Sequence, residues 1–127
     1  MRDFGKPEAI VMVLDSEPTM RAVLSDALES ANYMAVSAAD LGEAVQRLAE
    51  TPPDLLITRP YINNMPGWVA AEYLRTRQNG LPVLIVAGFM KDDRTEAQYT
   101  IKDFHTFPEA FGREDLVAAV KRVLAGK

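Results

Sequence analysis

The stretch Ala9-Ile-Val-Met-Val-Leu-Asp15-Ser-Glu-Pro18 decides the fold. Its first six residues form a short, continuous apolar run that ends at Asp15, which is typical of a strand buried on both faces. Pro18 fits the first turn of a helix. An apolar stripe at helical spacing then follows, made of Val23, Leu24, Ala27, Leu28 and Ala31. The stretch therefore predicts a buried strand that leads directly into an amphipathic helix.

The same alternation of apolar run and helical pattern recurs along the chain. We expect further strands at residues 33–37, 55–58, 83–87 and 103–106. Asp40 and Glu43 form a capping-box pattern that begins the second helix. A loop is expected over 59–65, followed by a helix that opens at Pro66-Gly67 and buries Trp68, Ala71 and Leu74. A short polar helix is expected over 91–100, and the last helix over 114–124, with acidic residues in its first turn and basic residues in its last.

Five strand–helix units in 127 residues predict one domain over residues 1–127, with a core from about 8 to 125. The expected fold is α/β and flavodoxin-like: a five-stranded parallel sheet of order 2-1-3-4-5 with helices on both faces. The switch point of that order lies between the first and third strands. Asp15 and Arg59, which end these two strands, should therefore face one another there.

Composition excludes several classes of function. The net charge is −4 and no long basic run exists, which argues against direct binding of nucleic acid. The chain has no cysteine and one histidine, so a thiolate or histidine-rich metal site is not expected. The N-terminus has no signal-peptide pattern, and no apolar stretch approaches the ~20 residues that span a bilayer. We expect a cytoplasmic protein without a cofactor.

Several segments, in order, resemble one known family. Residues 11–21, with Asp15 and the Glu17-Pro18 pair, resemble the start of response-regulator receiver domains of two-component signalling. Pro53-Asp54 and the strand after it resemble the lead-in to the family's phosphoacceptor. Gly67 falls at the family's loop glycine, residues 81–86 resemble its fourth strand, and residues 103–108 resemble its fifth strand with the Lys-Pro signature.

The resemblance also implies where the family's chemistry should lie, and most of the required side chains differ here. Asp15 matches the first of two magnesium-binding acids, and Ser16 stands at the second. Arg59 stands at the phosphoacceptor aspartate, Ala87 at the hydroxyl residue and Phe107 at the lysine. A guanidinium is not a nucleophile, and magnesium prefers carboxylate oxygens. We therefore expect no phosphotransfer enzyme but a degenerate receiver.

Two further expectations concern the site and the surface. We expect an ion pair between Asp15 and Arg59, because a partly buried carboxylate needs a partner; the alternative is that Arg59 points into solvent and Asp15 only caps the first helix. Phe104 matches the position of the family's switch aromatic, but without a hydroxyl at Ala87 we expect a static aromatic packed at the edge of the fifth strand. The resemblance places a partner-binding surface at Phe89, Met90, Tyr99 and Phe104.

The leading hypothesis is a receiver-like domain of a bacterial phosphorelay that acts by protein–protein contact. Its partner would be a histidine kinase, an output domain or a second copy of itself. The alternatives are a receiver phosphorylated at an atypical residue, a small flavodoxin-like cofactor binder, and a receiver-like part of a larger regulator.

Overall fold

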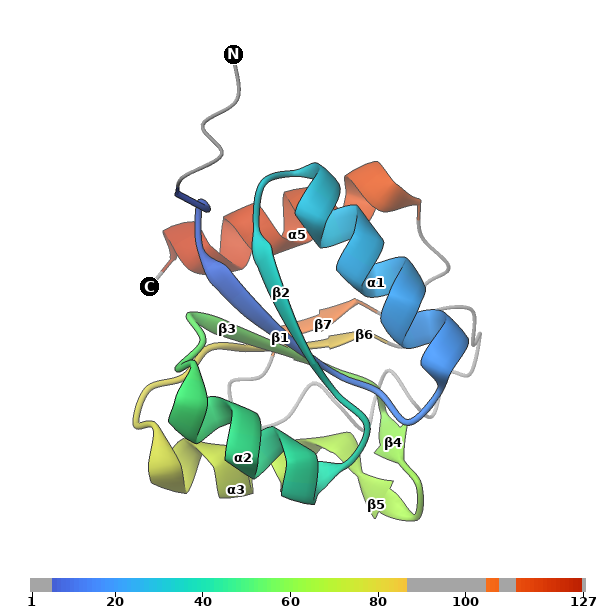
Figure 1. Cartoon of the computed structure of the whole chain (residues 1–127), viewed down its shortest axis with the longest axis vertical. Coiled ribbons are helices and arrows are strands. Elements are labelled where there is room, and N and C mark those ends of the chain that lie inside the picture. Colours follow the sequence, from blue (N-terminus) through green and yellow to red (C-terminus); the bar gives the residue numbers. More distant parts are fainter. Residues whose placement is uncertain (1–5, 87–104, 108–111, 127) are drawn as a thin grey trace.

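The computed structural model describes residues 6–86, 105–107 and 112–126, with backbone only at 105–107. Its centre is a parallel sheet in the order β2-β1-β3-β6-β7 (Figure 1). The strands are β1 (Ile10–Leu14), β2 (Met34–Ala38), β3 (Leu55–Thr58), β6 (Val83–Val86) and β7 (His105–Phe107). The helices are α1 (Pro18–Ser30), α2 (Leu41–Glu50), α3 (Gly67–Arg77) and α5 (Arg113–Ala125).

The expected α/β receiver-type architecture is confirmed, and β2, β1, β3 and β6 lie in the expected order. The last strand is described from His105 to Phe107, one residue beyond its expected end at 106, and it pairs in parallel with β6. Residues 103 and 104 lie outside the described residues. So do the expected polar helix at 91–100 and the positions Ala87, Phe89, Met90, Tyr99 and Phe104.

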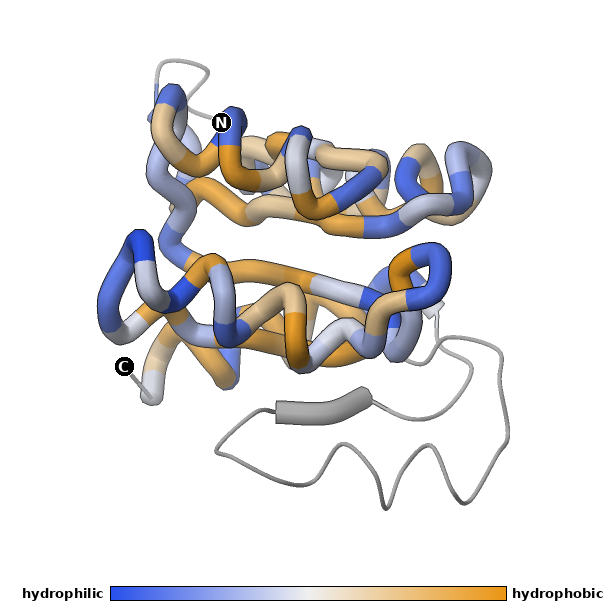
Figure 2. The backbone as a smooth tube through the Cα atoms, turned by 90° about the horizontal axis from the view of Figure 1, so that it is seen from below, coloured by the Kyte–Doolittle hydropathy of each residue, from blue (hydrophilic) through white to orange (hydrophobic). Residues whose placement is uncertain are grey.

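The sheet separates two hydrophobic clusters. Side chains alternate along a strand, so Val11 and Val13 pack with α1 and α5 on one face, whereas Met12 and Leu14 pack with α2 and α3 on the other. Hydrophobic residues accordingly run along the strands between the helix layers, and hydrophilic residues gather in loops and outer turns (Figure 2). Both faces of the first strand are buried, as its continuous apolar run predicts.

Three local expectations were wrong. Val23 was placed in the buried stripe of α1 but is 48% exposed, because the stripe is narrower and consists of Leu24, Ala27 and Leu28. The expected loop at 59–65 contains a small antiparallel hairpin of β4 (Tyr61–Ile62) and β5 (Met65–Pro66). Trp68 was expected on the buried side of α3 but is only half-buried beside its cluster. The buried residues of α3 include Ala70 instead.

The capping box at the start of α2 is present in a shifted form. The Asp40 carboxylate accepts a hydrogen bond from the backbone N–H of Glu43 at 2.8 Å. The Glu43 carboxylate accepts one from the N–H of Ala39, at 2.7 Å, rather than from that of Asp40. Two N–H groups at the helix start are therefore satisfied by side chains.

Candidate functional site

The strand register brings Asp15 and Arg59 together. Leu14 of β1 pairs with Thr58 of β3, so the next residue of each strand emerges at the same edge of the sheet. The two strands are neighbours and parallel, and their carboxyl ends form the expected switch point. Arg59 Nη1 lies 3.3 Å from Asp15 Oδ2. The expected ion pair is thus present, and the alternative of a solvent-directed guanidinium is wrong.

Asp15 is buried and both of its carboxylate oxygens have partners. The residue is 2% exposed. Oδ2 accepts from Arg59, and Oδ1 accepts from the backbone N–H of Glu17 at 2.9 Å. The second contact ties the carboxylate to the residue immediately before α1. Asp15 therefore joins the end of β1 both to the start of the first helix and to the end of β3.

The backbone that carries Arg59 is fixed by a close contact with Gly67. The backbone N–H of Gly67 donates to the carbonyl of Pro60 at 2.7 Å, which closes the β4–β5 hairpin against the end of β3. A Cβ atom on Gly67 would overlap the carbonyl oxygen of Arg59. Only glycine allows this approach, and the approach fixes the backbone that carries the guanidinium. The Arg59 side chain is 15% exposed.

A second arginine contacts Asp15 from the helix. Arg21 lies in α1, and its Nη1 donates to the backbone carbonyl of Asp15 at 2.8 Å. Arg21 was not among the expected site residues. Its position six residues after Asp15, one turn into a helix that starts at the same loop, was the available signal. Two cations therefore lie beside one buried carboxylate.

Burial dominates the electrostatics of this carboxylate. Loss of hydration raises the pKa of Asp15 above its ordinary value. The N–H of Glu17 and then the guanidinium of Arg59 lower that pKa, but they offset the effect of burial only in part. The cations therefore compensate a cost of ionisation instead of creating a strongly acidic group.

The described residues at this edge do not fit a magnesium ion. Magnesium takes oxygen ligands from one or two carboxylates, and here a single carboxylate has both oxygens engaged beside a guanidinium. Within the described parts of the chain, no three His, Cys, Asp or Glu residues gather closely enough to hold a metal ion. Ser16 follows Asp15 and is partly exposed.

The other expected site positions are only partly placed. Phe107 ends β7, next to Val86 of β6, so its backbone is at the same edge of the sheet. Nothing is described of its side chain, and Ala87 and Phe104 lie outside the described residues. Among the described helices, none is long and apolar enough to cross a membrane.

Comparisons with known proteins agree with the fold. The sequence profile of the response regulator receiver domain matches residues 11–121. The chain is 28% identical over 116 residues to the DNA-binding transcriptional regulator NtrC of Escherichia coli strain K12, which covers 91% of this chain and 25% of that protein. The chain thus spans about a quarter of the length of the curated relatives it matches.

Solved structures show the same architecture at low identity. The receiver domain of NtrX from Brucella abortus superposes with a TM-score of 0.82 at 18% identity, covering 92% of this chain and 99% of that one. The chemotaxis protein CheY4 of Vibrio cholerae gives 0.78 at 21% identity, covering 91% and 98%. At these identities the likeness concerns the fold alone.

Proposed function

The chain belongs to the response regulator receiver domain family, and from this premise we propose that it serves two-component phosphorelay signalling by protein–protein contact that does not depend on its own phosphorylation. The observation that carries the proposal is Arg59 at the end of β3, with its guanidinium on Asp15. By resemblance, β3 is the strand that ends in the phosphoacceptor aspartate. In this proposal the domain is not an enzyme.

The chemistry of the site supports this view. A guanidinium is cationic at any physiological pH and cannot accept a phosphoryl group. The buried carboxylate beside it has no oxygen left without a hydrogen-bond partner. In this proposal Arg59 occupies the space that metal and phosphoryl group take in phosphorylatable receivers, and it holds this edge of the sheet in one state.

The proposed partners are those that a receiver-like contact domain would meet: a histidine kinase, an output domain or another copy of the chain. NtrC is a DNA-binding regulator by name. The net charge of −4 makes direct nucleic-acid binding by this domain unexpected. We place the domain in the cytoplasm of a bacterium.

Phosphorylation in solution tests the proposal. The purified chain is incubated with acetyl phosphate and magnesium, and its intact mass is measured. We expect no gain of a phosphoryl group. A mass gain of one phosphoryl group on this chain would contradict the proposal and favour a receiver phosphorylated at an atypical residue.

A restoration experiment asks whether the substituted positions alone account for the site. The triple variant Ser16→Asp, Arg59→Asp, Phe107→Lys places three carboxylates and a lysine where the resemblance puts the family's chemistry. We expect magnesium binding by isothermal titration calorimetry in this variant and none in the unmodified chain. The matched control carries Ser16→Asn, Arg59→Asn and Phe107→Lys, which makes the same replacements without adding carboxylates, and it should bind no magnesium. Absence of magnesium binding by the triple variant would contradict the interpretation that the substituted positions alone account for the site.

A further inference from the structure

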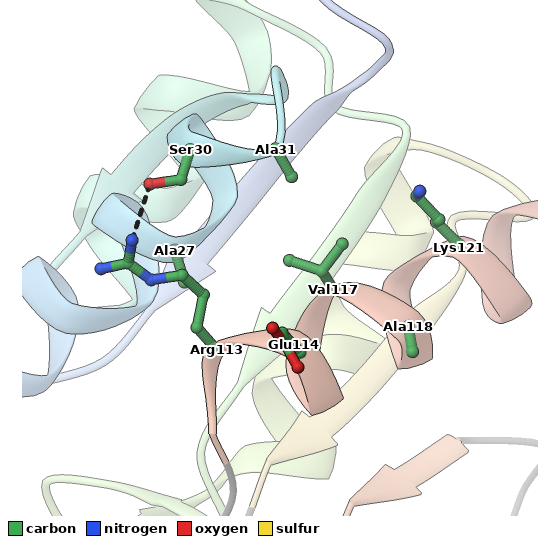
Figure 3. A pocket seen from close by; sticks show the side chains of 8 residues that line it. All are labelled: Ala27, Ser30, Ala31, Arg113, Glu114, Val117, Ala118 and Lys121. Atoms are coloured by element: carbon green, nitrogen blue, oxygen red, sulfur yellow. Dashed lines mark hydrogen bonds between the residues drawn. The ribbon is translucent and has the colours of Figure 1, made fainter.

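A groove lies between α1 and α5, on the opposite side of the sheet from α2 and α3. It has a volume of about 350 Å³. On the α1 side it is lined by Ala27, Ser30 and Ala31. On the α5 side the lining is Arg113, Glu114, Val117, Ala118 and Lys121 (Figure 3). Neither Asp15 nor Arg59 lines it. The groove exists because alanine and serine leave space between two helices that otherwise pack together.

One end of the groove is braced by an arginine. Arg113 reaches from the start of α5 across to α1, where Nη1 lies 3.1 Å from Ser30 Oγ and Nη2 lies 2.9 Å from Asp26 Oδ2. Figure 3 shows the side chain spanning the two helices. Arg113 therefore has its partners within the chain and bridges α1 and α5 through an exposed ion pair. Buried side chains such as Leu28 of α1 and Val120 of α5 belong to one cluster and hold the two helices together, so the groove between them is a preformed surface.

The two other charged residues that line the groove follow a symmetric order along α5. Glu114, Val117, Ala118 and Lys121 stand at i, i+3, i+4 and i+7, so they share one face of the helix. Among the described residues, neither Glu114 nor Lys121 has an ion-pair partner. The acid and the base lie at opposite ends of an apolar pair, ~10.5 Å apart along the helix axis.

We propose that this face is the contact surface of a two-fold symmetric dimer of the chain, in which two α5 helices pack antiparallel. The midpoint between Glu114 and Lys121 falls between Val117 and Ala118. A two-fold axis through that midpoint brings Glu114 of one copy to Lys121 of the other, twice over, as an isologous contact requires. Ala118 lets the helix axes approach, and Val117 enters the partner's groove beside Ala27 and Ala31.

The order of the charges also selects the orientation. A parallel pair of α5 helices would oppose Glu114 with Glu114 and Lys121 with Lys121, which is repulsive. The antiparallel pair turns both contacts into attractions and aligns the helix dipoles favourably. The inference rests on the proposed function in that it names the partner of a contact domain. It concerns a different surface, so the phosphorylation assay and the dimer assay can fail independently.

Sedimentation velocity of the purified chain tests the proposal, from about 10 µM to about 1 mM protein at about 0.15 M salt. We expect a reversible monomer–dimer equilibrium. Ala118→Arg places a guanidinium at the two-fold axis beside its own symmetry mate, and it should abolish the dimer. Ala49→Arg, an equally exposed helix position on α2, is the matched control and should leave the dimer unchanged. Circular dichroism establishes that both variants are folded.

Charge reversal identifies the pair. Lys121→Glu or Glu114→Lys alone converts both symmetric contacts to repulsion, so each should raise the dimer dissociation constant at least about tenfold. The double variant Glu114→Lys, Lys121→Glu restores opposite charges and should return the constant to within about threefold of the original. A chain that is monomeric throughout the concentration range overturns the proposal. So does a dimer that survives Ala118→Arg, or single reversals that the double variant does not rescue.

Discussion

Asp15 and Arg59 form an ion pair in which each charge offsets part of the free-energy cost of burying the other. Asp15 loses almost all contact with water, and burial raises its pKa despite the nearby guanidinium. A pair of this kind adds little stability relative to apolar residues, but losing one partner leaves the other charge uncompensated. The consequences of substitution should therefore depend on the protonation state of Asp15.

The first prediction concerns Arg59→Met. At pH 7 the variant should lose about 1–3 kcal/mol of unfolding free energy, because ionised Asp15 then lacks its cation. Removing Arg59 raises the folded-state pKa of Asp15 further, so folding favours the protonated acid more strongly. The loss of stability should be small below the unfolded pKa of about 4 and should grow as pH rises through the raised folded pKa.

Urea denaturation between pH 4 and 7 measures this effect. Arg47→Met is the control, since Arg47 forms an exposed pair with Glu50 at 3.8 Å and should change stability by less than about 0.5 kcal/mol at every pH. A loss for Arg59→Met that is the same at pH 4 and 7 would show that packing, and not charge, determines the role of Arg59.

Gly67 provides a second prediction at the scale of one residue. Gly67→Ala should destabilise the protein by roughly 2–3 kcal/mol, because the new methyl group overlaps the Arg59 carbonyl oxygen. Gly42→Ala is the matched control: the nearest atom to its added Cβ is an Asp40 carboxylate oxygen at 3.5 Å, an ordinary contact. In exposed α2 it should stabilise by about 0.5 kcal/mol. Thermal melts of both variants decide the question, and equal melting temperatures would contradict the steric argument.

Helices α1 and α2 begin in different ways, so substitutions of the residues just before them should change stability by different amounts. Asp40 caps α2 through the N–H of Glu43, whereas Glu17 precedes α1 without a side-chain cap. Asp40→Ala should therefore cost about 1 kcal/mol, and Glu17→Ala, also an exposed acid at a helix start, should cost less than about 0.5 kcal/mol. Chemical denaturation measures both, and an equal loss from the two substitutions would show that helix-dipole charge and not the hydrogen bond matters.

The β4–β5 hairpin shows what local pattern cannot predict. Its residues include Pro60, Asn63 and Asn64, which are typical of a loop, and Asn63 has a positive φ of 57°. Two short strands form there because Gly67 anchors the far end of the segment to Pro60. Neither the hairpin nor the contact between Gly67 and Pro60 was expected, because Pro60, Asn63 and Asn64 are typical of an irregular loop.

At the scale of the whole molecule, two clusters share one sheet, so they should unfold together. Leu28 belongs to the cluster under α1 and α5, whereas Trp68, the single tryptophan, packs at the edge of the other cluster. Leu28→Ala should cost about 2–5 kcal/mol. The urea transition followed by Trp68 fluorescence should shift as far as the one followed by circular dichroism. A fluorescence transition that stays in place would mean that the two faces unfold separately.

The continuous apolar runs made the sheet predictable, because strands buried on both faces leave a strong signal at β1, β3 and β6. The pairing of Asp15 with Arg59 was also predictable, since parallel register brings strand ends together. The exposure of Val23 was not, because an apolar residue at the margin of a stripe has no signature of its own. Arg21 was missed because its contact is with a backbone carbonyl, which any basic residue within reach could make.

The ion pair at the switch point also constrains how this site can change through mutation. Arg59→Asp alone would place two carboxylates at one buried edge without the guanidinium that now offsets the charge of Asp15. Two like charges that are buried close together destabilise the folded chain. This single step toward a two-carboxylate site thus lowers the stability of the folded chain. The ion pair between Asp15 and Arg59 is therefore easier to retain through mutation than to convert into a two-carboxylate site.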